Sequence, residues 1–135
     1  MFFFRTRKIQ TLEVLTLRIT GMRYTEEYEL AADGPSSVQV SRYQPLHGAQ
    51  EGRQLQARAV RDTEEVIRQL NACRVLQWDG FHGKHPRGVK DGRMFSLSAT
   101  VNGGKTVYAD GSQNFPSHFH ELTDWFRRVL TPEET

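Results

Sequence analysis

The chain has 135 residues, of which 37% are hydrophobic and 25% charged, so it is long enough for one domain with its own core and too apolar for a wholly disordered protein. Its 18 basic and 16 acidic residues leave a net charge of +2, which argues against a nucleic-acid binder with a dense basic face. The single cysteine excludes an internal disulfide, and no stretch is apolar for long enough to span a bilayer. At the N-terminus the apolar residues come before the charges, which is the reverse of a secretory signal. We therefore expect one cytoplasmic domain over residues 1–135 that does not contact a membrane.

Alternating apolar and polar residues predict three strands in the first part of the chain, at residues 9–20, 24–32 and 37–43. In the first strand Leu12 and Val14 fall out of phase with the residues that follow, so either both faces are partly covered or a bulge switches the phase. Only short turns separate the three segments. Because short turns join only antiparallel neighbours, we expect an antiparallel meander.

A fourth strand and a first helix follow. Residues 54–60 alternate weakly, because small alanines occupy some of the apolar positions. Asp62 then has the position of a helix cap, and Glu65 has the reciprocal position three residues later. Apolar residues recur at helical spacing as far as Cys73, which predicts a helix that ends near Arg74.

The clearest strand signal is the alternation at residues 95–101, which leads through the turn at 102–104 into a return strand. A three-residue loop pairs Val101 with Lys105 and turns Tyr108 away from the apolar face of the hairpin. A two-residue loop would turn Tyr108 towards that face. We favour the three-residue loop.

A last helix is expected to begin near Pro116, a residue suited to a first turn, and to end at Thr131. Its apolar residues form a strong stripe at helical spacing. Together these elements predict an α+β domain, with an antiparallel sheet of five or six strands and two helices packed on one face.

Three short motifs occur in the second half of the chain: Trp78-x-Gly80-Phe81, Asp91-Gly92-x-x-Phe95-x-Leu97 and Gly111-Ser112-x-x-Phe115-Pro116. In this order they resemble an uncharacterised small bacterial family that carries Trp-x-Gly-Phe, Asp-Gly-x-x-Phe and Gly-Ser-x-x-Phe/Tyr-Pro before a final helix. The resemblance spans roughly residues 15–130 and implies one domain. It implies no activity, cofactor or catalytic residue, because none is assigned to that family.

Residues 99–106 fit a relaxed phosphate-binding loop pattern, in which Lys105 and Thr106 would hold phosphates and a magnesium ion. Such a loop joins a strand to a helix, because the helix N-terminus faces the phosphates. Here a strand follows instead, and Ala99 has the position of the first glycine. We therefore expect a β-hairpin and no nucleotide cofactor.

Histidine and cysteine side chains could in principle hold a metal or act as a nucleophile. His118 and His120 would differ in direction by roughly 200° on a helix, so they could not share an ion. His82 and His85 lie in an expected loop without the spacing of a known metal site. Cys73 falls on the apolar stripe of its helix, as a core residue does. We expect no metal site, no cofactor and no cysteine nucleophile.

Four Asp-Gly pairs begin at Asp33, Asp79, Asp91 and Asp110. If their loops converge, Asp79, His82 and Asp91 could form the acid–base set of a small hydrolase-like or lyase-like enzyme. Turn formation explains all four pairs without catalysis. This enzyme is therefore our alternative hypothesis, and we assign no catalytic residue.

Our leading hypothesis is a non-enzymatic binding or protein-interaction domain that uses loops 78–93 and 111–116. These loops concentrate glycine turns, aromatic residues and mixed charge, and loops on a rigid scaffold commonly carry binding residues. The candidate contact residues, for an unknown protein or small-molecule partner, are Trp78, His82, Arg93 and Asn114.

Other interpretations of the same region stay open. Trp78 and the aromatic residues near it could instead plug the open end of the sheet. The basic loop at residues 84–93 lacks interleaved aromatic residues on which bases could stack, so we do not expect nucleic acid as a partner. A third hypothesis is a homo-oligomer, formed through an exposed sheet edge or through the polar face of Ser96, Ser98 and Thr100.

Overall fold

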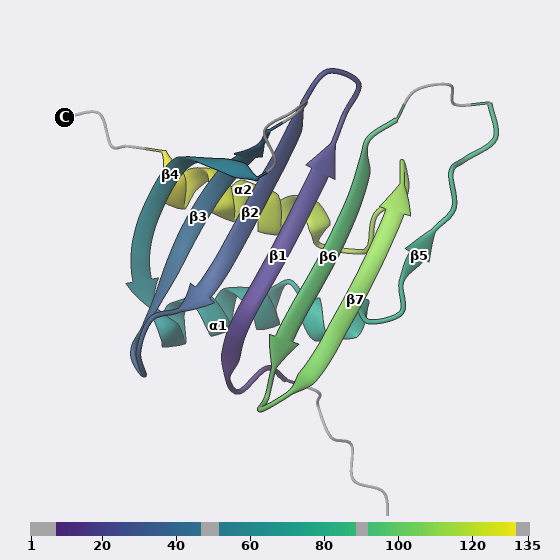
Figure 1. Cartoon of the computed structure of the whole chain (residues 1–135). Helices are drawn as coiled ribbons and strands as arrows, with labels where there is room; N and C mark the ends of the chain where they lie inside the picture. The colour runs from purple at the N-terminus through teal and green to yellow at the C-terminus, as the bar shows by residue number, and fades with distance from the viewer. Residues whose placement is uncertain (1–7, 47–51, 89–91, 132–135) are drawn as a thin grey trace, which may run out of the picture.

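A computed structural model describes residues 8–46, 52–88 and 92–131 of the chain. Within these residues seven strands form one sheet in the order β4-β3-β2-β1-β6-β7-β5 (Figure 1). Neighbouring strands are antiparallel except β5 and β7, which run parallel. The elements are β1 (Leu12–Thr20), β2 (Thr25–Ala32), β3 (Ser37–Pro45), β4 (Arg53–Asp62), α1 (Thr63–Ala72), the 3-10 helix η1 (Val75–Trp78), β5 (His82–Gly83), β6 (Met94–Val101), β7 (Lys105–Ser112) and α2 (Phe119–Leu130).

Both α-helices cross the same face of the sheet and leave the other face uncovered (Figure 1). The strand alternation decides which side chains go to which face. In β1, Leu15, Leu17 and Ile19 are buried, whereas Thr16 and Arg18 between them are partly or fully exposed. The expected α+β class with two helices is therefore confirmed, and the core lies between the sheet and the helices.

The sheet differs from the predicted one by its seventh strand. His82 was expected to lie in a loop, but His82 and Gly83 pair with Asp110 and Gly111 as the short parallel strand β5. A strand of two residues has no periodicity that a sequence could display. It forms because the chain returns from η1 along the outer edge of β7. The prediction of five or six antiparallel strands is therefore wrong on this point.

The structure decides one alternative that the sequence left open and confirms one register prediction. The pairing of β1 with β6 shifts between Leu12 and Val14, so a bulge is present, which was one of the two alternatives for the change of phase. The β6–β7 hairpin pairs Val101 with Lys105, so its loop has three residues. Tyr108 consequently faces away from the core and is 52% exposed.

The helix ends follow the prediction less closely. Asp62 has the cap position of α1, but its side chain makes no capping hydrogen bond. The Thr63 amide instead donates to the Ser36 carbonyl at 3.0 Å. Helix α2 begins three residues after Pro116, because His118 adopts a left-handed conformation with φ of 69° and so cannot belong to the helix.

Aromatic packing joins α2 to the sheet. The ring of Tyr28 on β2 stacks on Phe126 of α2 with centroids 4.7 Å apart. At the other end of α2, Phe119 packs against Phe95 at 4.8 Å and Phe115 at 4.7 Å. These contacts fix the end of β7 and the start of α2 against one another. No helix in the described segments is long and apolar enough to cross a bilayer.

The segment before β1 is held by two asparagine side chains. Asn71 accepts a hydrogen bond from the Ile9 amide at 2.8 Å and donates to the Ile9 carbonyl at 3.0 Å. Asn102, in the hairpin loop, accepts from the amides of Gln10 and Thr11 and donates to the Lys8 carbonyl at 3.1 Å. These bonds satisfy backbone groups that lie outside the sheet ladder.

Candidate binding surface

Trp78 lies in the core. Its side chain is only 3% exposed, and its indole nitrogen donates to the Ser117 carbonyl at 3.2 Å. The ring also packs against Phe119, with centroids 6.0 Å apart. Trp78 therefore fills the end of the sheet, which was the alternative interpretation of this tryptophan. Its side chain is too buried to contact a partner.

His82 lies on the edge strand β5 and points towards β7. Its Nδ1 is 2.9 Å from Asp110 Oδ1, and its side chain is 64% exposed. Three residues on, His85 Nδ1 is 2.9 Å from the hydroxyl of Ser112. Asp110 and Ser112 are two residues apart on β7 and so point to the same side of the sheet. The two contacts bind the loop after β5 to the outer edge of β7.

Asn114 crosses over the end of this strand pair. Its Nδ2 donates to the Lys84 carbonyl at 3.5 Å. The backbone of Asn114 passes so close to Gly83 that a Cβ there would lie 2.5 Å from the Asn114 carbonyl oxygen. A Cβ at Gly111 would overlap the same oxygen. The paired glycines of β5 and β7 thus leave room for the turn that carries Asn114.

Arg93 joins the other side of the same turn. Its amide donates to Gln113 Oε1 at 2.8 Å, and its carbonyl accepts from the Gln113 amide at 2.7 Å. The guanidinium of Arg93 lies 5.3 Å from the centre of the Phe115 ring, within the range of a cation–π contact. This contact orients the Arg93 side chain over the turn.

The structure therefore brings together three of the four predicted contact residues, His82, Arg93 and Asn114, although the two loops lie about thirty residues apart in sequence. Two large apolar side chains of the adjoining strands are exposed, Tyr108 of β7 at 52% and Met94 of β6 at 54%. We call this surface the β7 margin, and it consists of His82, His85, Arg93, Met94, Tyr108 and Asn114. The sequence could have indicated that Tyr108 and Met94 are exposed, because both occupy positions that alternate with the buried apolar residues of β6 and β7.

The β7 margin does not hold a complete catalytic set in the described residues. A nucleophile–base–acid triad needs one imidazole between the hydroxyl and the carboxylate. Here Ser112 contacts His85, whereas Asp110 contacts His82. The two halves of a triad belong to different histidines.

The other members of the enzyme hypothesis are occupied elsewhere or lie outside the description. Asp79 accepts a hydrogen bond from the Tyr108 amide at 2.9 Å, and its second oxygen lies 3.4 Å from Lys105 Nζ. Asp91 lies outside the described residues. Asp79 therefore ties the loop after η1 to β7, which is a structural role.

The cysteine and histidine considered above as a nucleophile or a metal ligand, Cys73 and His118, also make structural contacts. Cys73 is buried, and this burial raises the pKa of its thiol, so it is a core residue and a poor nucleophile. His118 Nδ1 lies 2.9 Å from Glu121 Oε1 at the start of α2. Among the described residues no three histidine, cysteine or carboxylate side chains are grouped as metal ligands would be.

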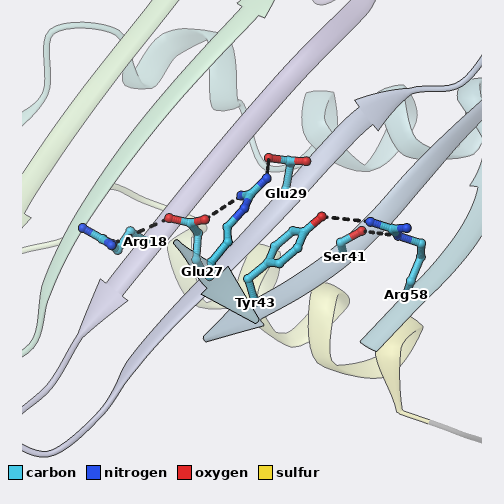
Figure 2. A network of polar contacts seen from close by, with 7 residues as sticks. Arg18, Glu27, Glu29, Ser41, Tyr43 and Arg58 are labelled. Carbon is cyan, nitrogen blue, oxygen red and sulfur yellow. Dashed lines mark hydrogen bonds and ion pairs between the residues drawn. The ribbon is translucent and has the colours of Figure 1, made fainter. Parts of the chain in front are cut away.

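A second polar cluster lies on the uncovered face over β1 to β4 (Figure 2). Arg53 on β4 bonds to Glu27 at 2.6 Å and to Glu29 at 2.8 Å, and its guanidinium lies 3.7 Å above the ring of Tyr43. Arg18 on β1 extends the cluster to Glu27 at 3.7 Å. Desolvation lowers the pKa of Arg53, but the hydrogen bonds that Arg53 donates to Glu27 and Glu29, together with their charges, raise the pKa overall.

Arg58 completes this cluster at the β4 edge. It donates to Ser41 Oγ at 3.0 Å and to the Tyr43 hydroxyl at 2.8 Å, and both acceptors are buried (Figure 2). Across four strands the cluster pairs Arg18 and Arg53 with two glutamates and joins Arg58 to two hydroxyl groups. Its arginines also place charge on the edge strand β4, which has a register shift beside Tyr43, and both features discourage pairing with another sheet. We therefore interpret the cluster as structural.

No protein-family model matches the chain, and comparisons with curated proteins and with solved structures find no match either. The interpretation of the β7 margin therefore depends on its own geometry.

Proposed function

We propose that the protein is a non-enzymatic interaction domain that recognises a protein partner through the β7 margin. One observation carries the proposal: side-chain hydrogen bonds join two distant loops into one rim, and the adjoining strands β6 and β7 each expose a large apolar side chain. A fixed rim reduces the ordering cost of association, because its side chains are already held in place.

The chemistry of the margin favours a protein over a small molecule. Protein interfaces combine apolar or aromatic anchors with a polar rim that makes hydrogen bonds. Tyr108 and Met94 supply the anchors, and His82, Arg93 and Asn114 supply the polar groups. The described hollows of about 470 and 590 Å³, which have the volume of small-molecule sites, are lined by other residues.

The hydrolase-like or lyase-like alternative keeps one observation in its favour, the contact between His82 and Asp110. A carboxylate that orients an imidazole is half of a general-base arrangement. The alternative requires that Asp79 and Asp91 act with His82 on one substrate. His82→Gln would then abolish turnover of any substrate found, whereas an interaction domain would show no turnover to lose.

Site-specific photo-crosslinking tests the proposal. A photoreactive phenylalanine derivative at position 108 in the full chain should crosslink one discrete protein in cells of the source organism. The matched control carries the same group at Val60, which is 53% exposed on the opposite edge of the same sheet face. Met94→Glu should remove the crosslink from position 108 without lowering the melting temperature by more than about 2 °C, because Met94 is exposed.

Two results would contradict the proposal. One is that positions 108 and 60 give the same pattern of crosslinks, which would mean that the margin has no preferred partner. The other is a crosslink from position 108 to a second copy of this chain, which would make the margin a homo-oligomer interface.

A further inference from the structure

A groove on the covered side of the molecule has a different character from the β7 margin. It has a volume of about 470 Å³ and lies between α1 and α2, which cross the same face of the sheet (Figure 1). Helix α1 lines it with Glu65, Arg68, Gln69 and Ala72, helix α2 with Trp125, Arg128 and Val129, and the end of β4 with Arg61.

Three of these lining residues are arginines from three different elements. Arg61 bonds only to the carbonyl of its neighbour Val60, at 3.0 Å, and within the described segments neither Arg68 nor Arg128 forms an ion pair. The arginines that do form ion pairs in the described residues, Arg18, Arg53 and Arg127, line other surfaces. The groove therefore brings together three arginines that form no ion pair within the described residues.

The charge balance of the groove favours a dianion. Glu65 is the one acidic residue among the lining residues, so the lining carries an excess of two positive charges. A phosphate monoester carries about −1.5 to −2 charges near neutral pH. The guanidinium fork binds phosphate oxygens in pairs, which makes arginine better suited to this group than lysine.

The groove also has an apolar wall. Trp125 is almost wholly buried, and it lines the groove beside Val129 and opposite Ala72. Small-molecule sites combine such apolar lining with a few convergent polar groups, in volumes of roughly 300–1,000 Å³. We propose that this groove is an anion site for a small molecule that carries a phosphate group, with Arg61, Arg68 and Arg128 as the phosphate ligands and Trp125 and Val129 against its apolar part.

This site does not depend on the proposed function. The groove opens between the helices, whereas Tyr108 of the β7 margin projects from the uncovered face of the sheet. One site can exist without the other.

The test uses the full chain labelled with ¹⁵N and titrated with inorganic phosphate at constant ionic strength and pH 7.5. The two tryptophans provide an internal comparison in the indole region of the NMR spectrum. The Trp125 signal should shift and reach saturation, whereas the Trp78 signal should not move, because Trp78 packs elsewhere against Phe119.

Three variants make the test specific. Arg68→Gln with Arg128→Gln should weaken phosphate binding by about tenfold or more. Arg23→Gln with Arg87→Gln is the matched control, because it removes the same charge from two exposed arginines outside the groove and should leave binding unchanged. Glu65→Gln removes the one acidic lining residue and should tighten binding severalfold, a gain that damage to the fold could not produce.

Three outcomes would overturn the proposal. The two double variants could weaken binding equally, which would show general attraction to a basic surface. Glu65→Gln could leave the affinity unchanged. A triglutamate peptide, titrated in parallel, could bind more tightly than phosphate, which would assign the groove to an acidic protein segment.

Discussion

Gly111→Ala should destabilise the protein and disturb the β7 margin. In most strands this substitution is favourable, because glycine has more conformational freedom to lose on folding and costs roughly 0.5–1 kcal/mol relative to alanine. Gly111 is different, because it pairs with Gly83 at the place where the backbone of Asn114 passes close to both glycines. An added Cβ would overlap the Asn114 carbonyl oxygen and lie 2.7 Å from Phe95 Cε1.

The magnitude follows from what can move. A flexible side chain could rotate away from the new methyl group, but the Asn114 carbonyl belongs to the backbone of a turn that is bonded on both sides. Overpacking of this kind costs about 1–3 kcal/mol, and a backbone obstacle favours the upper end of that range. After the entropic gain of roughly 1 kcal/mol is subtracted, we expect a net loss of about 2 kcal/mol. For 135 residues this corresponds to about 7 °C in melting temperature.

Urea unfolding and NMR together check this prediction. The free energy of unfolding should fall by the stated amount, and the amide signals of His82 and Asn114 should shift. Gly34→Ala is the control, because Gly34 has φ of +81° and no heavy atom within 4 Å of a new Cβ. It should cost about 1 kcal/mol from backbone strain alone and leave the His82 and Asn114 signals in place. If Gly111→Ala proved as stable as the wild type, the proposed crowding at Asn114 would be wrong.

Three further predictions concern the rest of the fold. Arg53→Ala removes two partly exposed ion pairs and a cation–π contact, so it should lower the free energy of unfolding in urea by about 1.5–2 kcal/mol. The loss should be clearly smaller in 1 M NaCl than at low salt, because salt screens exposed charges. An equal loss at low and high salt would contradict an electrostatic origin. Asn102→Gly allows the positive φ of 52° but removes the side-chain hydrogen bonds to the segment before β1, so the free energy of unfolding measured by thermal unfolding should fall by about 1–2 kcal/mol. Asn102→Ala should lose about 1 kcal/mol more, because alanine is strained at a positive φ. Burial, together with the nearby Glu26, raises the pKa of the Tyr28 hydroxyl above its ordinary value of 10.0. The unfolded chain therefore loses the hydroxyl proton at a lower pH than the folded chain, so the free energy of unfolding should fall as the pH rises above 10.0. Tyr28→Phe should flatten this fall in stability at alkaline pH, and an unchanged fall would show that other groups cause it.

Local patterns in the sequence were enough for the strands that form hairpins. The alternation of residues 95–101 and the glycines after Asn102 predicted both the β6–β7 pairing and its three-residue loop, whereas the change of phase at Leu12 left the bulge in β1 as one of two alternatives. These features depend on residues close together in the chain, whose side-chain period is fixed by backbone geometry. The apolar stripe of α2 is predictable for the same reason, whereas its start shifted because His118 adopts a left-handed conformation.

The sequence also named half of the residues of the β7 margin as contact candidates, but not their arrangement. It marked His82, Arg93 and Asn114 as loop residues, but Trp78 in the same motif proved to be buried. A tryptophan next to a glycine turn has the same sequence pattern whether it faces a partner or the core. Its burial depends on Ser117 and Phe119, which lie about forty residues further along the chain.

Composition, alternation and turn chemistry thus determined the fold class, the two helices and the register of the β6–β7 hairpin of this protein. Only the tertiary structure decided the parallel pairing of β5, the division of Ser112 and Asp110 between two histidines, and the meeting of Arg61, Arg68 and Arg128 in one groove. The physical reason is the range of the interactions. Periodicity records which face of an element a side chain occupies, whereas these contacts depend on how separate elements pack on a shared core, and no local pattern encodes that packing.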